Sequence, residues 1–192
     1  MSLDRKYKAV VIGGSAGSFA VVSKILAQLN KEFPLPIILC LHRLKHVRSG
    51  LVEGLNLKSN IEVVEPFDKE KIMAGRVYLA PANYHLFLDF DYTFSLSTEE
   101  VLNHSRPLID HTLSSAGFLY REKLVGILLT GANRDGAKGM KDIADKKGFT
   151  IVQDPSTCEV DTMPKAALKI MSPDLILDYN GIINFLNSLE AY

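Results

Sequence analysis

The stretch AVVIGGSAGSFAVVSKILAQLN, residues 9–30, decides the fold class of this chain. It begins with a short apolar run of strand-forming residues, and a glycine-rich turn follows this run directly. After the turn, apolar residues recur at the spacing of a helix that buries one face. A buried strand, a tight turn and an amphipathic helix form the beginning of a β-α-β unit, so the stretch predicts a parallel sheet.

The same alternation continues along the chain. The expected strands are 7–14, 35–42, 123–131, 149–153 and 174–178, and the expected helices are 19–30, 136–148, 163–171 and 180–192. Residues 77–97 instead alternate apolar and polar side chains, which predicts an antiparallel hairpin attached to the sheet. We therefore expect an α/β fold, a three-layer α/β/α sandwich with a mostly parallel, doubly wound sheet.

The composition predicts one domain, residues 1–192, and excludes several classes of partner. A chain of 192 residues with 47% hydrophobic residues can bury one substantial core. The 22 basic residues balance the 22 acidic ones, so no overall field favours nucleic acid or an anionic membrane. No apolar run approaches the ~20 residues that span a bilayer, and the N-terminus lacks a signal-peptide core. We expect a cytoplasmic protein without membrane insertion.

The two cysteines are expected to be free thiols. Cys40 lies in an apolar run and Cys158 in a polar segment, which is neither a disulfide framework nor a metal-ligand spacing. We expect no metal and no cofactor.

Three residues whose side chains can take part in catalysis lie at the ends of three of the predicted strands. Ser15 follows the first strand, His42 closes the second, and Asp135 lies in the loop TGANRDG after the third long apolar run. Parallel strands wound by right-handed crossovers end at one edge of the sheet, where ligands bind. A serine, a histidine and an aspartate at one edge are the set that acyl transfer requires.

Each of these residues also has a structural alternative. Ser15 could cap the following helix or bind a phosphate, although GGSAGS fits neither the dinucleotide fingerprint nor the Walker A pattern. His42 could hydrogen-bond a loop, and Asp135 could be a turn residue because Asp-Gly is a strong turn signal.

Seven segments together resemble the catalytic domain of chemotaxis-specific protein-glutamate methylesterase (CheB). They occur in that family's order and approximate spacing, from about residue 8 to the last predicted helix. The segments are IGGSAGS, the LH of ILCLH, VYLAPANYHL, SRPLID, ILLTGANRDGAKGM, IVQDPST and MPKAAL. The resemblance implies a serine hydrolase that demethylates glutamate γ-methyl esters on chemoreceptors and releases methanol, with deamidation of receptor glutamines as a related activity.

The resemblance also assigns roles to residues of this sequence. It implies that Ser15 is the nucleophile, His42 the general base and acid, and Asp135 the orienting carboxylate. The implied oxyanion donors are the backbone N–H groups of Ala16 and of Ala132 in the turn after Gly131.

The sequence departs from the family pattern around two of these positions. The family's GMGxDG appears as GANRDG, which places Ala132 where methionine is common. Leu41 precedes the histidine in place of glutamine, and RLKHVRS follows it in place of methionine and two prolines. We hypothesise that the basic residues Arg43, Lys45 and Arg48 of this segment dock an acidic receptor helix.

The chain begins its first catalytic strand almost at once, so we expect no receiver domain in cis. The expected partners are the cytoplasmic helices of chemoreceptors as substrate and a receiver-domain protein in trans as a regulator. A constitutive stand-alone esterase and an excised domain are the other possibilities. Two further functions stay open: a non-catalytic binding module of the same fold, and a serine esterase or amidase acting outside chemotaxis.

Overall fold

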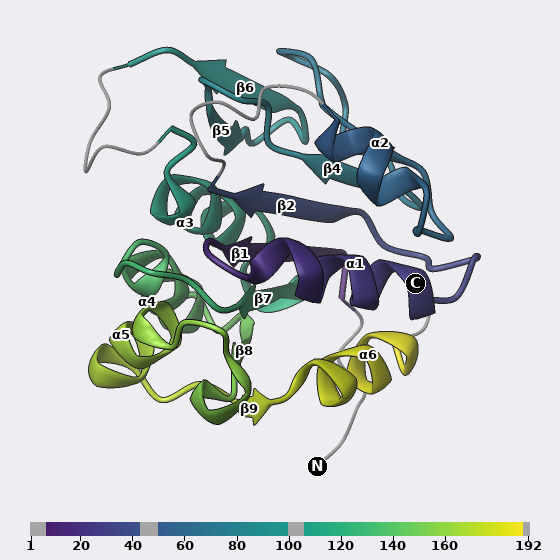
Figure 1. Cartoon of the computed structure of the whole chain (residues 1–192). Helices are drawn as coiled ribbons and strands as arrows, with labels where there is room; N and C mark the ends of the chain where they lie inside the picture. The colour runs from purple at the N-terminus through teal and green to yellow at the C-terminus, as the bar shows by residue number, and fades with distance from the viewer. Residues whose placement is uncertain (1–6, 43–49, 100–105, 190–192) are drawn as a thin grey trace.

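A computed structural model describes residues 7–42, 50–99 and 106–189 (Figure 1). Its main sheet has seven strands, and every pairing between neighbours is parallel. In spatial order the strands are β3 (Val63–Val64), β4 (Val77–Leu79), β2 (Ile37–Leu41), β1 (Ala9–Gly14), β7 (Leu124–Leu128), β8 (Phe149–Gln153) and β9 (Leu175–Leu177). The predicted fold class is confirmed.

The strand order reverses its direction at the centre of the sheet. The chain moves from β1 outward through β2, and later returns to place β7 on the other side of β1. Gly14 pairs with Leu41 across β1 and β2, and Gly13 pairs with Leu128 across β1 and β7. The loops after β1 and β7 therefore flank the switch point, where open α/β sheets bind ligands.

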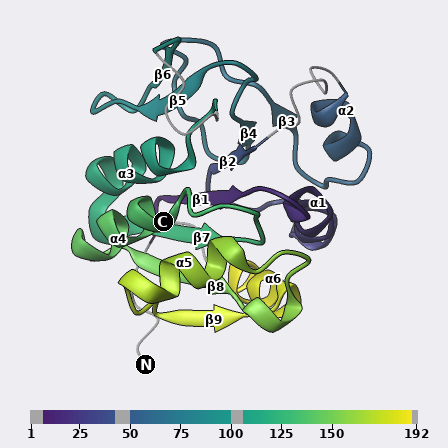
Figure 2. The same cartoon turned by 60° about the vertical axis from the view of Figure 1, so that its left-hand side comes forward.

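Helices cover both faces of the sheet (Figure 2). One apolar cluster lies between the sheet and α1 (Ser18–Gln28), α2 (Leu51–Asn56) and α6 (Tyr179–Asn187). A second cluster lies between the other face and α3 (Ile109–Tyr120), α4 (Ala137–Asp145) and α5 (Thr162–Ile170). Two 3₁₀ turns, Arg121–Lys123 and Pro155–Thr157, complete the helical elements of the described residues.

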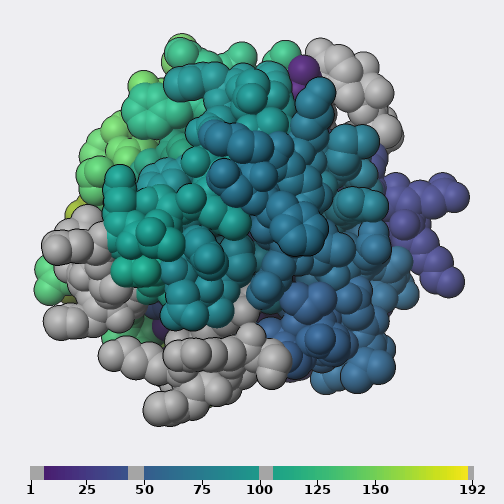
Figure 3. Space-filling model, turned by 90° about the horizontal axis from the view of Figure 1, so that it is seen from above, coloured from purple at the N-terminus to yellow at the C-terminus, as the bar shows by residue number. Residues whose placement is uncertain are grey.

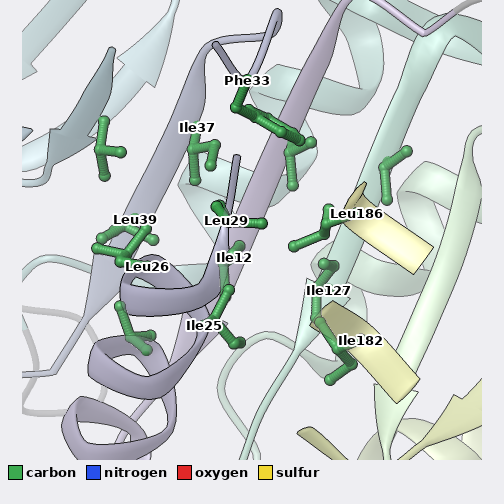
Figure 4. Close-up of a cluster of buried hydrophobic side chains, with 14 of the residues drawn as sticks. Ile12, Ile25, Leu26, Leu29, Phe33, Ile37, Leu39, Ile127, Ile182 and Leu186 are labelled. Carbon is green, nitrogen blue, oxygen red and sulfur yellow. The ribbon is translucent and has the colours of Figure 1, made fainter. Parts of the chain in front are cut away.

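The central strands are buried on both faces because their side chains alternate between the two clusters. Val10 and Ile12 point into the cluster under α1 and α6, whereas Ala9 and Val11 point into the cluster under α3 and α4. Figure 4 shows Ile12 of β1 among side chains of α1, β2, β7 and α6. This two-sided burial explains why the strand segments are continuous apolar runs.

The antiparallel hairpin is shorter than predicted. Val77–Leu79 is not part of it but forms β4, a parallel member of the main sheet. The reason is that all three residues are buried, and Pro81 ends the run before the alternating pattern begins. The hairpin is a separate two-stranded sheet of β5 (His85–Leu88) and β6 (Phe94–Ser97).

The hairpin is attached to α3 through side-chain hydrogen bonds. Thr112 Oγ1 donates to Leu86 O at 2.8 Å, and Leu88 N donates to Ser115 Oγ at 3.1 Å. Figure 3 looks down on this end of the molecule, which the hairpin and the rest of segment 50–99 cover. Across 7–42, 50–99 and 106–189, no helix has both the length and the apolar character needed to cross a membrane.

Candidate active site

Three neighbouring strands end at one edge of the sheet and carry the three residues that the sequence singled out. Hydrogen bonds join the chain just beyond these strand ends. His42 donates its backbone N–H to Gly14 O, and Ser15 donates its backbone N–H to Thr130 O, both at 3.0 Å. Ser15, His42 and the loop that holds Asp135 therefore leave the sheet side by side.

Ser15 lies in the turn between β1 and α1, and its side chain does not cap the helix. The N-cap of α1 is Gly17, whose φ of 79° is left-handed. Ser18 closes the turn, because its N–H and its hydroxyl donate to Ser15 O at 2.9 and 2.6 Å. Within the described residues the half-buried Ser15 hydroxyl has no hydrogen-bond partner. The helix-cap alternative is therefore wrong.

His42 and Asp135 form a direct contact. Nε2 of His42 lies 2.7 Å from Oδ2 of Asp135, and the two side chains are only 10% and 4% exposed. A carboxylate can only accept hydrogen bonds, so Nε2 carries the proton and donates it. In the tautomer that carries its only ring proton on Nε2, the free electron pair lies on Nδ1, which is then the nitrogen that can act as a base.

The Asp135 carboxylate also receives backbone hydrogen bonds. Oδ2 accepts from Ile109 N at 2.8 Å, and Oδ1 accepts from Asp110 N and Gly136 N, both at 2.9 Å. Burial alone would raise the pKa of Asp135, but the hydrogen bonds from His42, Asp110 and Ile109 outweigh burial and lower it. The carboxylate therefore stays ionised beside His42 at neutral pH.

Asn133 is a site residue that the sequence did not indicate. Its Oδ1 accepts the backbone N–H of Asp135 at 3.0 Å, and its Nδ2 lies 3.3 Å from Nδ1 of His42. The first contact is an Asx turn, which an asparagine two residues before its partner can signal. The second contact joins residues 91 positions apart, so only the fold reveals it.

The two residues expected to supply oxyanion donors lie in the turns on either side of the switch point. Ala16 is half-buried and follows Ser15, and its carbonyl accepts from Thr130 Oγ1 at 3.0 Å. Ala132 is exposed, whereas the N–H of Gly131 before it is used by Val160 O at 3.0 Å. The part of the chain that the structure describes offers no acceptor to the N–H of Ala16 or of Ala132.

The expected docking residues Arg43, Lys45 and Arg48 lie outside the described residues. Two other histidines lie away from the His42 contact, under the hairpin. His85 accepts Leu108 N at Nδ1, at 3.2 Å, and His111 stacks on Phe87 with ring centroids 5.1 Å apart. These contacts give both rings packing roles between the hairpin and α3.

A doubly wound sheet whose carboxyl edge gathers a serine and a histidine-carboxylate pair is typical of an α/β enzyme that performs acyl transfer. The chain belongs to the CheB methylesterase family, since the sequence model of that family matches residues 10–186. This finding confirms the resemblance seen in the seven sequence segments.

Individual relatives agree with this assignment. Proteins from two Leptospira interrogans serovars, each named a candidate protein-glutamate methylesterase/protein-glutamine glutaminase, are 40% identical over 96% of this chain and 95% of their own length. The Thermotoga maritima protein-glutamate methylesterase/protein-glutamine glutaminase is 34% identical over 88% of this chain and 50% of its own length. The crystal structure of the Thermotoga maritima CheB methylesterase catalytic domain covers 96% of this chain and 100% of that one, with TM-score 0.90 and 33% identity.

Proposed function

We propose that this chain is a serine esterase that hydrolyses glutamate γ-methyl esters on the cytoplasmic helices of chemoreceptors and releases methanol. The observation that carries the proposal is the His42–Asp135 contact beside Ser15, in a chain of the CheB methylesterase family. The contact defines which ring nitrogen of His42 is unprotonated, and the hydroxyl of Ser15, at the end of the neighbouring strand, has no hydrogen-bond partner within the described residues.

In the proposed acylation step, Ser15 Oγ attacks the ester carbonyl carbon while its proton passes to Nδ1 of His42. The Asp135 carboxylate stabilises the imidazolium through Nε2. The tetrahedral intermediate then expels methoxide, which takes the proton from Nδ1 and leaves as methanol. The glutamyl group remains bound to Ser15 as an acyl ester.

In the proposed deacylation step, water attacks the acyl carbon and gives its proton to the same nitrogen of His42. The intermediate collapses, Ser15 recovers the proton, and the glutamate carboxylate is released. A glutamine side chain enters the same sequence with ammonia as the leaving group, which gives deamidation. In both steps the N–H groups of Ala16 and Ala132 are the proposed donors to the oxyanion.

The proposed substrate also defines location and partners. Because the methylated side chains belong to cytoplasmic receptor helices, we place the protein in the cytoplasm. A receiver-domain protein in trans is the proposed regulator. The test measures the rate of methanol release without a receiver protein, with the unphosphorylated receiver and with the phosphorylated receiver. A rate that is the same in all three conditions contradicts regulation in trans.

The experiment that tests the function measures methanol release from a methylated chemoreceptor cytoplasmic fragment. The wild type is compared with Ser15→Ala and with Ser23→Ala, a matched serine-to-alanine control on α1. Ser23 is 4% exposed and its hydroxyl has no partner within the described residues, so its removal should cost little. We expect release from the wild type and Ser23→Ala, and a loss of at least about 10³-fold in Ser15→Ala.

A different result would identify one of the rival functions. Binding of the receptor fragment without release, in wild type and variant alike, would indicate a binding module. Covalent labelling of Ser15 by a sulfonyl fluoride, without methanol release, would indicate an esterase or amidase with another substrate.

A further inference from the structure

The side chain of Asn133 connects the proposed base to the loop that orients it. Its Oδ1 accepts the N–H of Asp135 at 3.0 Å, which fixes the other end of the amide as the NH₂ group. That NH₂ group lies 3.3 Å from Nδ1 of His42. Since Nε2 of His42 donates to Asp135, Nδ1 is an acceptor, and the Asn133 amide donates to it.

The network is consistent for only one arrangement of protons on the ring. Nε2–H faces a carboxylate oxygen, and the electron pair of Nδ1 faces an amide hydrogen. The reversed tautomer would place two hydrogens against each other at Asn133 and two electron-rich atoms against each other at Asp135. Asn133 and Asp135 thus select the same tautomer from opposite sides of the imidazole.

The same contact covers the nitrogen that the reaction needs. In the proposed mechanism the Ser15 proton passes to Nδ1, yet Nδ1 already accepts a hydrogen bond from Asn133. The Ser15 hydroxyl has no hydrogen bond to any described residue, His42 included. Proton transfer therefore requires the amide to withdraw, and a contact of 3.3 Å is at the long, weak end of the hydrogen-bond range.

We propose that Asn133 is a positioning residue that holds His42 in its Nε2–H tautomer and covers Nδ1 until the ester binds and Ser15 takes its place. The inference rests on the proposed function of Ser15 and His42. In this role the Asn133 amide blocks the base nitrogen and keeps Ser15 weakly activated before the ester binds. We call this block the latch. The anchored Oδ1 keeps the amide close to the ring when the NH₂ group withdraws.

The first test observes the ring directly. Nitrogen NMR of ¹⁵N-histidine-labelled protein distinguishes protonated from unprotonated ring nitrogens, and the His42 signals are assigned by their loss in His42→Gln. We expect wild-type His42 to carry its proton on Nε2 with Nδ1 unprotonated. In Asn133→Asp the carboxylate keeps the Asp135 N–H bond but presents an acceptor to Nδ1, so we expect a larger fraction of rings to be protonated on both nitrogens than in the wild type.

The second test measures the latch without a receptor substrate. A small sulfonyl fluoride is reacted with Ser15, and labelling is followed by mass spectrometry. Asn133→Ala uncovers Nδ1, so we expect its labelling rate to rise about threefold to tenfold, the equivalent of one net hydrogen bond. Asn133→Asp should label more slowly than the wild type because Nδ1 is occupied by a proton. Arg134→Ala, an exposed neighbour in the same loop, should match the wild type.

The outcomes separate this proposal from the proposed function. A wild-type ring protonated on Nδ1 alone, or slower labelling in Asn133→Ala, would overturn the latch even if methanol release is observed. Expected ring signals with no labelling of Ser15 in any variant would instead overturn the nucleophile assignment, and with it the latch. Expected ring signals with faster labelling in Asn133→Ala support the proposal whichever ester is the substrate.

Discussion

Oδ2 of Asp135 accepts the backbone N–H of Ile109 at 2.8 Å, so the carboxylate that holds His42 also holds the first residue of α3. The adjacent N–H of Asp110 binds the other oxygen of the same carboxylate at 2.9 Å. A helix leaves its first N–H groups without intrahelical acceptors, and here a residue from a distant loop satisfies two of them. Asp135 therefore couples the geometry of the site to the packing of α3.

Asp135→Asn should reduce both activity and stability. The asparagine oxygen can replace only one carboxylate oxygen, and its NH₂ group faces backbone donors that then lose their acceptor. We expect the free energy of unfolding to fall by about 2–3 kcal/mol at neutral pH, and kcat for methanol release to fall by about 10³–10⁴-fold. Chemical denaturation and the methanol assay measure the two effects.

The stability difference should also depend on pH in a defined direction. The pKa of Asp135 is lowered in the folded protein, so its carboxylate contributes to the free energy of unfolding at any pH above its unfolded pKa of about 4. This contribution is lost as the pH falls from that value through the lower, folded pKa. The difference in free energy of unfolding between wild type and Asp135→Asn should therefore become smaller at acid pH. Asp145→Asn, whose side chain is 56% exposed on α4, is the control and should change little. Full stability in Asp135→Asn would contradict the role in α3.

Ile109 also explains a requirement for glycine at position 136. Gly136 is the N-cap of α4 with φ 89°, and a Cβ there would lie 2.8 Å from Ile109 Cγ2 and 2.6 Å from Leu128 Cδ1. Gly50 is the N-cap of α2 with φ 88°, but a Cβ added there would have no heavy atom of a described residue within 4 Å. The two glycines share a left-handed backbone and differ in crowding.

Alanine at each position should separate the two effects. Gly50→Ala should cost about 1 kcal/mol from the left-handed backbone alone, whereas Gly136→Ala adds overpacking and should cost about 3 kcal/mol. Thermal or denaturant unfolding of both variants measures the difference. The added Cβ at position 136 would displace Ile109, whose N–H binds Asp135. Gly136→Ala should therefore also lower kcat, while Gly50→Ala should not. Equal losses of stability would show that the contact with Ile109 relaxes freely.

The thiol of Cys158 should react slowly at neutral pH. Burial, followed by the charges of Asp161 and Asp154, raises the pKa of Cys158 to about 11. Since the thiolate is the nucleophile, alkylation by iodoacetamide should rise roughly tenfold per pH unit between about pH 8 and 10. Mass spectrometry of the labelled peptide measures the rate, and Cys158→Ala removes the signal. An alkylation rate that stops rising at about pH 9 would contradict the raised pKa. Cys40 is 0% exposed and should not be labelled.

Most of the strands and helices were predictable because they depend on local periodicity, but the expected helices included neither α2 nor the full length of α3. The site edge was also predictable, since parallel strands force Ser15, His42 and the loop of Asp135 to one end of the sheet. By contrast, β3 has two residues and β4 has three, which is too short for a periodic signal. The assignment of 77–79 to the hairpin was wrong because this run pairs in parallel with β2 and β3, and no local alternation of side chains signals that pairing.

The details of the site required the folded structure for a similar reason. Asp135 binds the start of α3 across 26 positions, and Asn133 reaches His42 across 91. Neither contact leaves a pattern in the local sequence, because backbone donors carry no residue-specific signature and asparagine is common in loops. Composition and periodicity locate a site, whereas long-range side-chain contacts determine its protonation.

The basic segment after His42 gives the last prediction. Arg43, Lys45 and Arg48 follow the proposed base, and the proposed substrate is a glutamate-rich helix. Reversal of Arg43 and Lys45 to glutamate should lower kcat/KM for a methylated receptor fragment by about tenfold at low salt, mainly through association. The deficit should shrink as salt is raised, because the Debye length falls from about 30 Å at 0.01 M to about 8 Å at 0.15 M.

A matched double reversal at Lys31 and Lys58 changes the net charge equally. Both lysines are exposed, and they follow the C-terminal ends of α1 and α2, away from the carboxyl edge of the sheet. This control should leave kcat/KM nearly unchanged if the effect is local to the docking segment. Equal losses in both double variants would mean that net charge, and not the segment after His42, attracts the receptor helix. A loss at Arg43 and Lys45 that persists at high salt would point to direct contact in place of long-range steering.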